Sequence, residues 1–122
     1  MTCPFCERLA GGDALAGRLP DAYPVADGHT LVVPRRHESD LFALAPAEWD
    51  AVWQLVADVK AELEVTYSPD GFNVGVNVGA AAGQTVAHAH VHVIPRFEGD
   101  VPDPRGGVRW VIPEKAPYWR GR

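Results

Sequence analysis

Residues 83–96 read GQTVAHAHVHVIPR, and three histidines in this stretch, His88, His90 and His92, alternate with alanine and valine. Side chains on a β-strand point alternately to its two faces, so this spacing predicts a strand that carries its three imidazoles on one face. The alanines and valines at positions 87, 89, 91 and 93 would then point to the opposite face and pack on a hydrophobic core. Packing does not require three titratable rings in register, and we therefore expect a functional site on the histidine face.

Two kinds of chemistry use such a row of imidazoles. Histidines two residues apart on a strand can converge on one metal ion, or one ring can act as a nucleophile that its neighbours orient. The lead-in favours the nucleophile, because Gly83, Gln84 and Thr85 offer backbone N–H groups, an amide and a hydroxyl that suit phosphate oxygens. The metal alternative stays open on these residues alone.

The segment before the lead-in predicts a second strand. Residues 71–78 read GFNVGVNV, with Asn73, Gly75 and Asn77 on one face and apolar side chains on the other. If this strand pairs antiparallel with the histidine strand, its polar face lies beside the imidazoles. The glycine at position 75 then leaves room for a bound ligand.

Residues 77–96 resemble the signature of the histidine triad family of nucleotidyl hydrolases and transferases, in which Gly-Gln-Ser/Thr-Val precedes three histidines that alternate with apolar residues. Residues 28–37, GHTLVVPRRH, are similar to an earlier strand of that family. The resemblance covers about residues 3–96. It implies one α+β domain over residues 1–122, with its motif core at 21–96 and a C-terminal loop and tail at 97–122. The implied fold has about five antiparallel strands and one main helix, and it forms a homodimer.

The resemblance also implies a mechanism. His90 attacks the α-phosphate of a nucleotide and carries the nucleotidyl group until water or another acceptor takes it. The backbone carbonyl of His88 accepts the proton of the other His90 ring nitrogen, and His92 reaches a phosphate oxygen. The substrate-binding residues implied in the same way are Asp21 at the ribose hydroxyls, His29 at the nucleoside pocket, and Asn77, Gly83, Gln84, Thr85, Val86 and His92 near the phosphates.

The implied substrates are dinucleoside polyphosphates, nucleoside phosphoramidates or similar nucleotides, with an adenine nucleotide expected and no organic cofactor. Two alternatives stay open. One is a metal-dependent hydrolase that uses the three histidines as ligands, and the other is a nucleotide-binding protein without catalysis.

The two cysteines, Cys3 and Cys6, are spaced like zinc thiolates or a redox pair. A redox pair is expected at a helix start inside a βαβ unit, which the sequence does not predict here. Resemblance to zinc-containing histidine triad proteins and to galactose-1-phosphate uridylyltransferases suggests His37 and His88 as the other ligands. Four protein ligands leave no open coordination position, so such a zinc would be structural. The alternative is a reduced pair in a small hydrophobic turn.

The remaining patterns predict the scaffold. Apolar residues at helical intervals predict a helix from residue 46 to about 66, with proline at its first position but with Ala45, a weak capping residue, before it. Two short strands are expected at 22–26 and 30–33, joined by Asp27-Gly28, and one more at 108–112. The aromatic residues of the tail are expected at a subunit interface; they are Trp110, Tyr118 and Trp119.

Composition agrees with this interpretation. A chain of 122 residues with 47% hydrophobic residues is long enough for one domain with a core. Its net charge of -5 argues against a nucleic-acid groove, and no apolar run approaches the length of a membrane span. Two closely spaced cysteines do not suggest a disulfide framework, so we expect a reducing cytoplasm.

Overall fold

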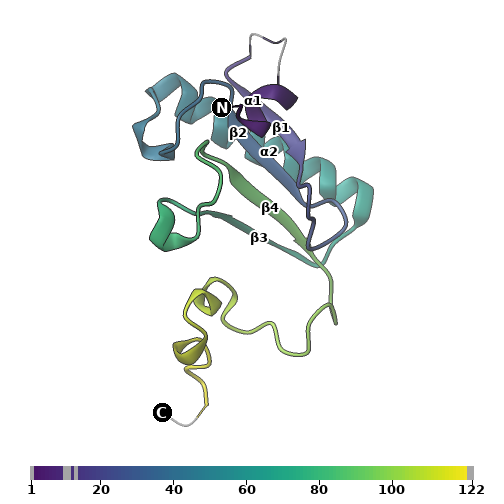
Figure 1. The fold of residues 1–122 in the computed structure, drawn as a ribbon. Coiled ribbons are helices and arrows are strands. Elements are labelled where there is room, and N and C mark those ends of the chain that lie inside the picture. The colour runs from purple at the N-terminus through teal and green to yellow at the C-terminus, as the bar shows by residue number, and fades with distance from the viewer. Residues whose placement is uncertain (1, 10–11, 13, 121–122) are drawn as a thin grey trace.

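The computed structural model describes residues 2–9, 12 and 14–120 (Figure 1). An antiparallel sheet of four strands, in the order β1-β2-β4-β3, carries one long helix on one face. The helices and strands are α1 (Pro4–Arg8), β1 (Ala16–Pro20), β2 (Thr30–Pro34), α2 (Pro46–Tyr67), β3 (Gly71–Val76) and β4 (Val91–Arg96), with short 3₁₀ helices at η1 (Leu41–Ala43), η2 (Ala80–Ala82), η3 (Gly107–Val111) and η4 (Pro113–Lys115).

The two faces of the sheet have separate cores. Valines and a leucine of α2 pack on one face against Val32, Val91 and Val93. On the other face, Phe5 of α1 packs against Leu31 and Val33 of β2. Burial on both sides explains why β2 reads as a continuous apolar run, as is usual for a central strand. The small helix α1 therefore lies on the face that carries the side chain of His92, since Leu31 and His92 are paired in the register.

The pairing of β3 with β4 confirms the predicted antiparallel arrangement. Gly75 lies opposite His92 and Asn73 lies opposite Ile94, so the polar face of β3 adjoins the histidine face of β4. The main helix is also confirmed, because α2 begins at Pro46 as predicted and ends at Tyr67. Its start lacks a side-chain cap on Ala45, but the Glu48 carboxylate accepts the N–H of Ala45 at 2.9 Å.

The histidine strand is shorter than predicted. β4 begins at Val91, so His88 and His90 precede it and are not held by ladder hydrogen bonds. The N–H of Ala89 instead donates to the carbonyl of Glu38 at 2.7 Å, which pulls this segment away from β3. Ala87 is consequently exposed and does not face the core.

Two predicted strands were wrong, and the sheet has four strands where about five were expected. Residues 21–29 form a loop, because Pro24 has no N–H for a ladder, and the strand that pairs with β2 is Ala16–Pro20. Residues 108–112 belong mainly to η3, which begins at two glycines with positive φ, Gly106 before it at 96° and Gly107 as its first residue at 47°. Across the described part of the chain, no helix combines the length and the apolar character that a membrane crossing requires.

Candidate active site and metal centre

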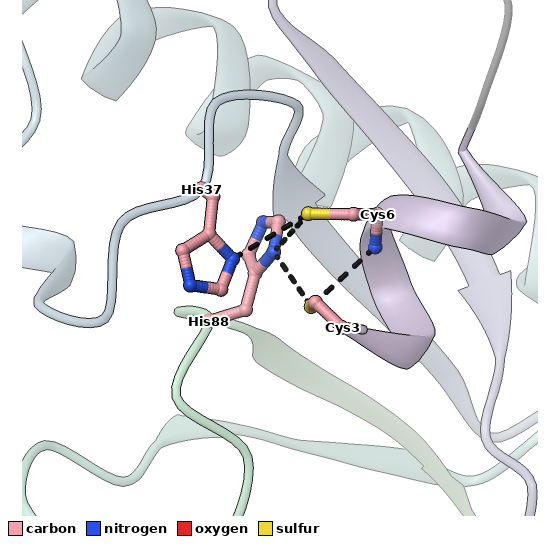
Figure 2. A group of neighbouring side chains, drawn as sticks. All are labelled: Cys3, Cys6, His37 and His88. Atoms are coloured by element: carbon pink, nitrogen blue, oxygen red, sulfur yellow. Dashed lines mark hydrogen bonds between the residues drawn. The ribbon is translucent and has the colours of Figure 1, made fainter. Parts of the chain in front are cut away.

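Four side chains from three parts of the chain meet beside α1 (Figure 2). Cys3 caps the N-terminus of α1 and Cys6 lies within it, while His37 follows β2 and His88 precedes β4. The Nδ1 atom of His88 lies 3.4 Å from Sγ of Cys3 and 3.5 Å from Sγ of Cys6. The Nδ1 atom of His37 lies 3.4 Å from Sγ of Cys6.

These distances fit a zinc site. Bonds of 2.3 Å to sulfur and about 2.05 Å to nitrogen give tetrahedral S···N edges of about 3.5 Å. All four ligand atoms lie within 4.8 Å of one another. Nε2 of His88 lies 2.6 Å from the carbonyl of Pro34, so it carries the ring proton and leaves the Nδ1 lone pair facing the sulfurs. Burial lowers the pKa of His88, which favours the neutral ring that binds metal.

The three histidines of the predicted row have different surroundings. Both nitrogens of His88 are engaged, one at the cysteines and one at Pro34. His90 instead packs between Phe5, with ring centroids 5.0 Å apart, and His92, at 5.2 Å. Within the part of the chain that the structure describes, the three rings do not surround a common point, so the geometry does not favour the three-histidine metal alternative.

The orientation of His90 follows from one hydrogen bond. Its Nδ1 lies 2.9 Å from the backbone carbonyl of His88, and a carbonyl oxygen only accepts, so Nδ1 carries the proton. This leaves Nε2 as the ring nitrogen that can act as a nucleophile. The side chain is 8% exposed, and its edge-on neighbour Phe5 restricts its rotation.

His92 is held by His29, which is buried just before β2. Nε2 of His29 lies 2.9 Å from Nδ1 of His92, and Oδ2 of Asp21 lies 3.3 Å from the same His29 nitrogen. Burial is the main cause that lowers the pKa of both His29 and His92. The pair is therefore neutral at pH 7.

A cavity of about 680 Å³ opens beside His29 and His92. It lies between the C-terminal segment and the face of β3 and β4 that carries Gly75 and His92. Figure 1 shows that segment turning back below β3 after β4 ends. A side chain at Gly75 would meet no atom within 4 Å at its Cβ, so the glycine keeps this part of the floor low. Its lining includes His29, Gly75, Asn77, His92, Val108 and Trp110.

The predicted substrate residues are distributed unevenly around this cavity. His29, Asn77 and His92 line it, whereas Asp21 lines a second hollow of about 520 Å³ beside β1 and α2. The amide of Gln84 is engaged by the protein itself. It accepts from the N–H of Gly79 in its own loop at 2.9 Å and donates to the carbonyl of Ser39, far away in the sequence, at 2.8 Å. Among the described residues that line the larger cavity, none belongs to the predicted lead-in; its members are Gly83, Gln84, Thr85 and Val86.

Two features of the site were not predicted from the sequence. The first is Phe5, whose ring contacts those of His88 and His90. Its position between the two cysteines could have indicated this, because a metal that joins the cysteines to His88 also brings Phe5 close to the histidines. The second feature is the wall formed by the C-terminal segment, for which the sequence carries no periodic pattern.

Comparison with known proteins agrees with this geometry. The sequence profile of the HIT domain matches residues 11–99. An uncharacterised HIT-like protein of Mycoplasma genitalium is 38% identical over 105 residues, which are 80% of this chain and 74% of that protein. The asymmetrical bis(5'-nucleosyl)-tetraphosphatase of Schizosaccharomyces pombe is 40% identical over 77 residues, 63% of this chain and 42% of the enzyme. An adenylylsulfatase of Arabidopsis thaliana is 33% identical over 106 residues, 80% of this chain and 54% of the enzyme.

The chain thus spans about half the length of these two enzymes. Among solved structures, a Zn-bound histidine triad family protein from Mycobacterium smegmatis has a TM-score of 0.73 and 30% identity over 90% of each chain. A profile match over most of the length, together with relatives at this identity, shows that the chain belongs to the histidine triad (HIT) family.

Proposed function

We propose that this protein is a nucleotide hydrolase or nucleotidyl transferase that acts at the α-phosphate through a covalent intermediate on His90. The observation that carries the proposal is the 2.9 Å contact between Nδ1 of His90 and the carbonyl of His88. It places a proton on Nδ1, so Nε2 is the ring nitrogen that can attack phosphorus. His92, whose ring centroid lies 5.2 Å from that of His90, is within reach of the same phosphate.

The reaction has two displacements at phosphorus. In the first, the Nε2 lone pair of His90 forms a P–N bond while the bond from phosphorus to the leaving atom breaks and its electrons depart with the leaving group. In the second, the oxygen of water attacks phosphorus, the P–N bond breaks, and its electrons return to Nε2. The water proton passes to solvent, and a mononucleotide is released.

The expected substrates are adenine nucleotides with a leaving group on the α-phosphate. Support comes from relatives whose names describe cleavage of dinucleoside tetraphosphates and of adenylylsulfate. The cavity of about 680 Å³ beside His92 is of the size of small-molecule sites in proteins. A panel of diadenosine tetraphosphate, adenosine phosphoramidate and adenylylsulfate, ranked by kcat/KM, identifies the preferred leaving group.

Rapid quench tests the intermediate. Wild-type protein mixed with α-labelled diadenosine tetraphosphate should carry acid-labile label within the first turnover. His90→Asn should carry none and should lose turnover, while circular dichroism reports an unchanged fold. Turnover at the wild-type rate in His90→Asn would overturn the mechanism, and tight binding without turnover in the wild type would favour the non-catalytic alternative.

We further propose that Cys3, Cys6, His37 and His88 hold a structural zinc. The S···N distances of 3.4 to 3.5 Å support this assignment. Zinc would supply a cross-link between α1 and the segment before β4, and it would have no open position for substrate. Elemental analysis should find one zinc per chain in the wild type and loss of it in Cys6→Ser.

We also propose a homodimer in a reducing cytoplasm, where the two free cysteines stay reduced and available as ligands for zinc. Apolar and aromatic side chains on the C-terminal segment support the dimer; Ile112 is 54% and Tyr118 53% exposed, and neither is among the described residues that line the cavity. Light scattering of the purified protein should give twice the mass of one chain, and Ile112→Asp should lower it to one.

A further inference from the structure

Asp21, His29 and His92 form a second cluster of titratable groups, and the proposed reaction gives no role to the first two as a unit. Asp21 directly follows β1, His29 directly precedes β2, and His92 is the second residue of β4. His29 is 5% exposed, and Oδ2 of Asp21 lies 3.3 Å from its Nε2 and 3.7 Å from Nδ1 of His92. A buried polar cluster at the edge of the cavity has a structural cost unless its hydrogen bonds are satisfied.

A backbone amide sets the direction of the hydrogen bonds in this cluster. The N–H of Val25 donates to Nδ1 of His29 at 3.2 Å, so that nitrogen carries a lone pair. A neutral His29 then has its proton on Nε2 and donates it to Nδ1 of His92, 2.9 Å away. His92 must in turn carry its proton on Nε2, as a hydrogen-bond donor.

The carboxylate of Asp21 is oriented to support this direction. Its Oδ1 accepts the N–H of Tyr23 at 2.8 Å, which aims Oδ2 at Nε2 of His29. A negative charge at 3.3 Å favours a proton on that nitrogen. The Asp21 side chain is 16% exposed, so water screens this effect less than it would at the surface.

The same three side chains resemble a cation site, since their ligand atoms lie within 4.8 Å of one another. An ion there would need lone pairs on both Nε2 of His29 and Nδ1 of His92. His29 would then carry its proton on Nδ1, facing the N–H of Val25, and both donors would lose a partner. The hydrogen bond from Val25 therefore favours a proton-bearing chain over a metal.

We propose that Asp21 and His29 are positioning residues that hold His92 as a neutral Nε2–H tautomer, so that His92 donates a hydrogen bond to an oxygen of the reacting phosphate. The assignment rests on the proposed function and gives Asp21 a positioning role in addition to the ribose contact that the resemblance implies. The donor stabilises charge that develops on phosphate in the transition state, without transfer of its own proton. Loss of such an orienting partner lowers activity about 10- to 100-fold.

The kinetic test uses Asp21→Asn with two substrates that differ only in ribose and 2′,3′-dideoxyribose. A positioning role predicts a drop of about 10-fold or more in kcat, equal for both sugars, with KM little changed. A ribose contact alone predicts a higher KM for the ribonucleotide and unchanged kcat for both substrates, which would overturn the proposal. Asp27→Asn, an exposed acid in the same loop, is the matched control for loss of charge.

His29 provides a rescue test on the same substrates. His29→Gln keeps an amide N–H that reaches Nδ1 of His92, whereas His29→Leu removes every donor. We expect His29→Gln to retain at least several-fold more kcat than His29→Leu. Equal kcat in the two variants would contradict the positioning role.

The tautomers are measured in the zinc-loaded protein without substrate, by ¹⁵N chemical shifts of the imidazoles. We expect His29 and His92 both as Nε2–H, and a change at both rings in Asp21→Asn. A proton on Nδ1 of His92, or a second zinc that shifts both rings on titration, would overturn the proposal. This measurement needs no turnover. Absence of nucleotidyl-His90 in the wild type would therefore overturn the proposed function, whereas the chemical shifts would still show whether Asp21 and His29 set the tautomer of His92.

Discussion

The glycine at position 75 allows the floor of the cavity to be raised without disturbing the fold. We predict that Gly75→Ile stabilises the protein and weakens nucleotide binding. Gly75 lies in β3 opposite His92, and an added Cβ there meets no atom within 4 Å. Its φ is not positive, so a branched side chain fits the strand.

Both magnitudes follow from this geometry. Replacing glycine in a strand by a β-branched residue removes unfolded-chain entropy and gains about 1 kcal/mol, which raises the Tm of a domain of this size by about 4 °C. The four side-chain carbons would project into the cavity beside His92. A clash or lost contact worth about 1.4 kcal/mol weakens binding about tenfold.

Gly71→Ile is the matched control. Gly71 lies on the same strand and the same face, its Cβ also meets nothing within 4 Å, and it does not line the cavity. The Tm of thermal unfolding should rise in both variants. The affinity for a non-hydrolysable adenine nucleotide, measured by calorimetry, should fall in Gly75→Ile alone. Wild-type affinity in a folded Gly75→Ile would refute the assignment of this cavity to the nucleotide.

Three further predictions concern the two histidine sites. Cys6→Ser should lose zinc and several kcal/mol of unfolding free energy, because metal binding is coupled to folding; a Tm equal to that of zinc-loaded wild type would contradict this. Phe5→Leu should cost about 1 kcal/mol of stability and also lower kcat, because the edge-on ring that restricts His90 is lost; unchanged kcat at saturating substrate would show that the contact is only packing. Burial lowers the pKa of His92 below 6.5, so the unfolded chain binds more protons than the folded one as pH falls. Stability should therefore be fully present above pH 6.5 and decline below it, and in urea titrations His92→Asn should decline less; an identical decline would contradict the burial argument.

The sequence predicts those parts of the fold where local pattern and tertiary packing agree. The helix from Pro46 and the alternation of β3 are of this kind, since α2 buries one face and Phe72 and Val76 of β3 pack, partly buried, against the same core. Gly75 beside His92 was expected from alternation and antiparallel pairing alone. At these residues, the pattern of the neighbouring few positions is sufficient to predict the local structure.

The remaining parts depend on contacts between distant residues. The alternation around His88 has a strand period, but the carbonyl of Glu38 takes the N–H of Ala89, and the cluster near Cys3 and Cys6 takes the His88 ring. Residues 22–26 have a mostly apolar, strand-like composition, yet their conformation is set by Pro24 and by the hydrogen bond from the N–H of Val25 to Nδ1 of His29. Such partners cannot be inferred from periodicity, because they lie tens of residues away or act through the backbone.

His88 also has a consequence for how the chain is made. Its ring meets Cys3, 85 positions earlier, while its carbonyl aligns the ring of His90. During synthesis the cysteines and His37 emerge first, and His88 follows only when most of the chain has been made, so closure of this long loop is a late event. An unfinished chain therefore has no aligned nucleophile, and the capacity to react with nucleotides arises together with completion of the fold.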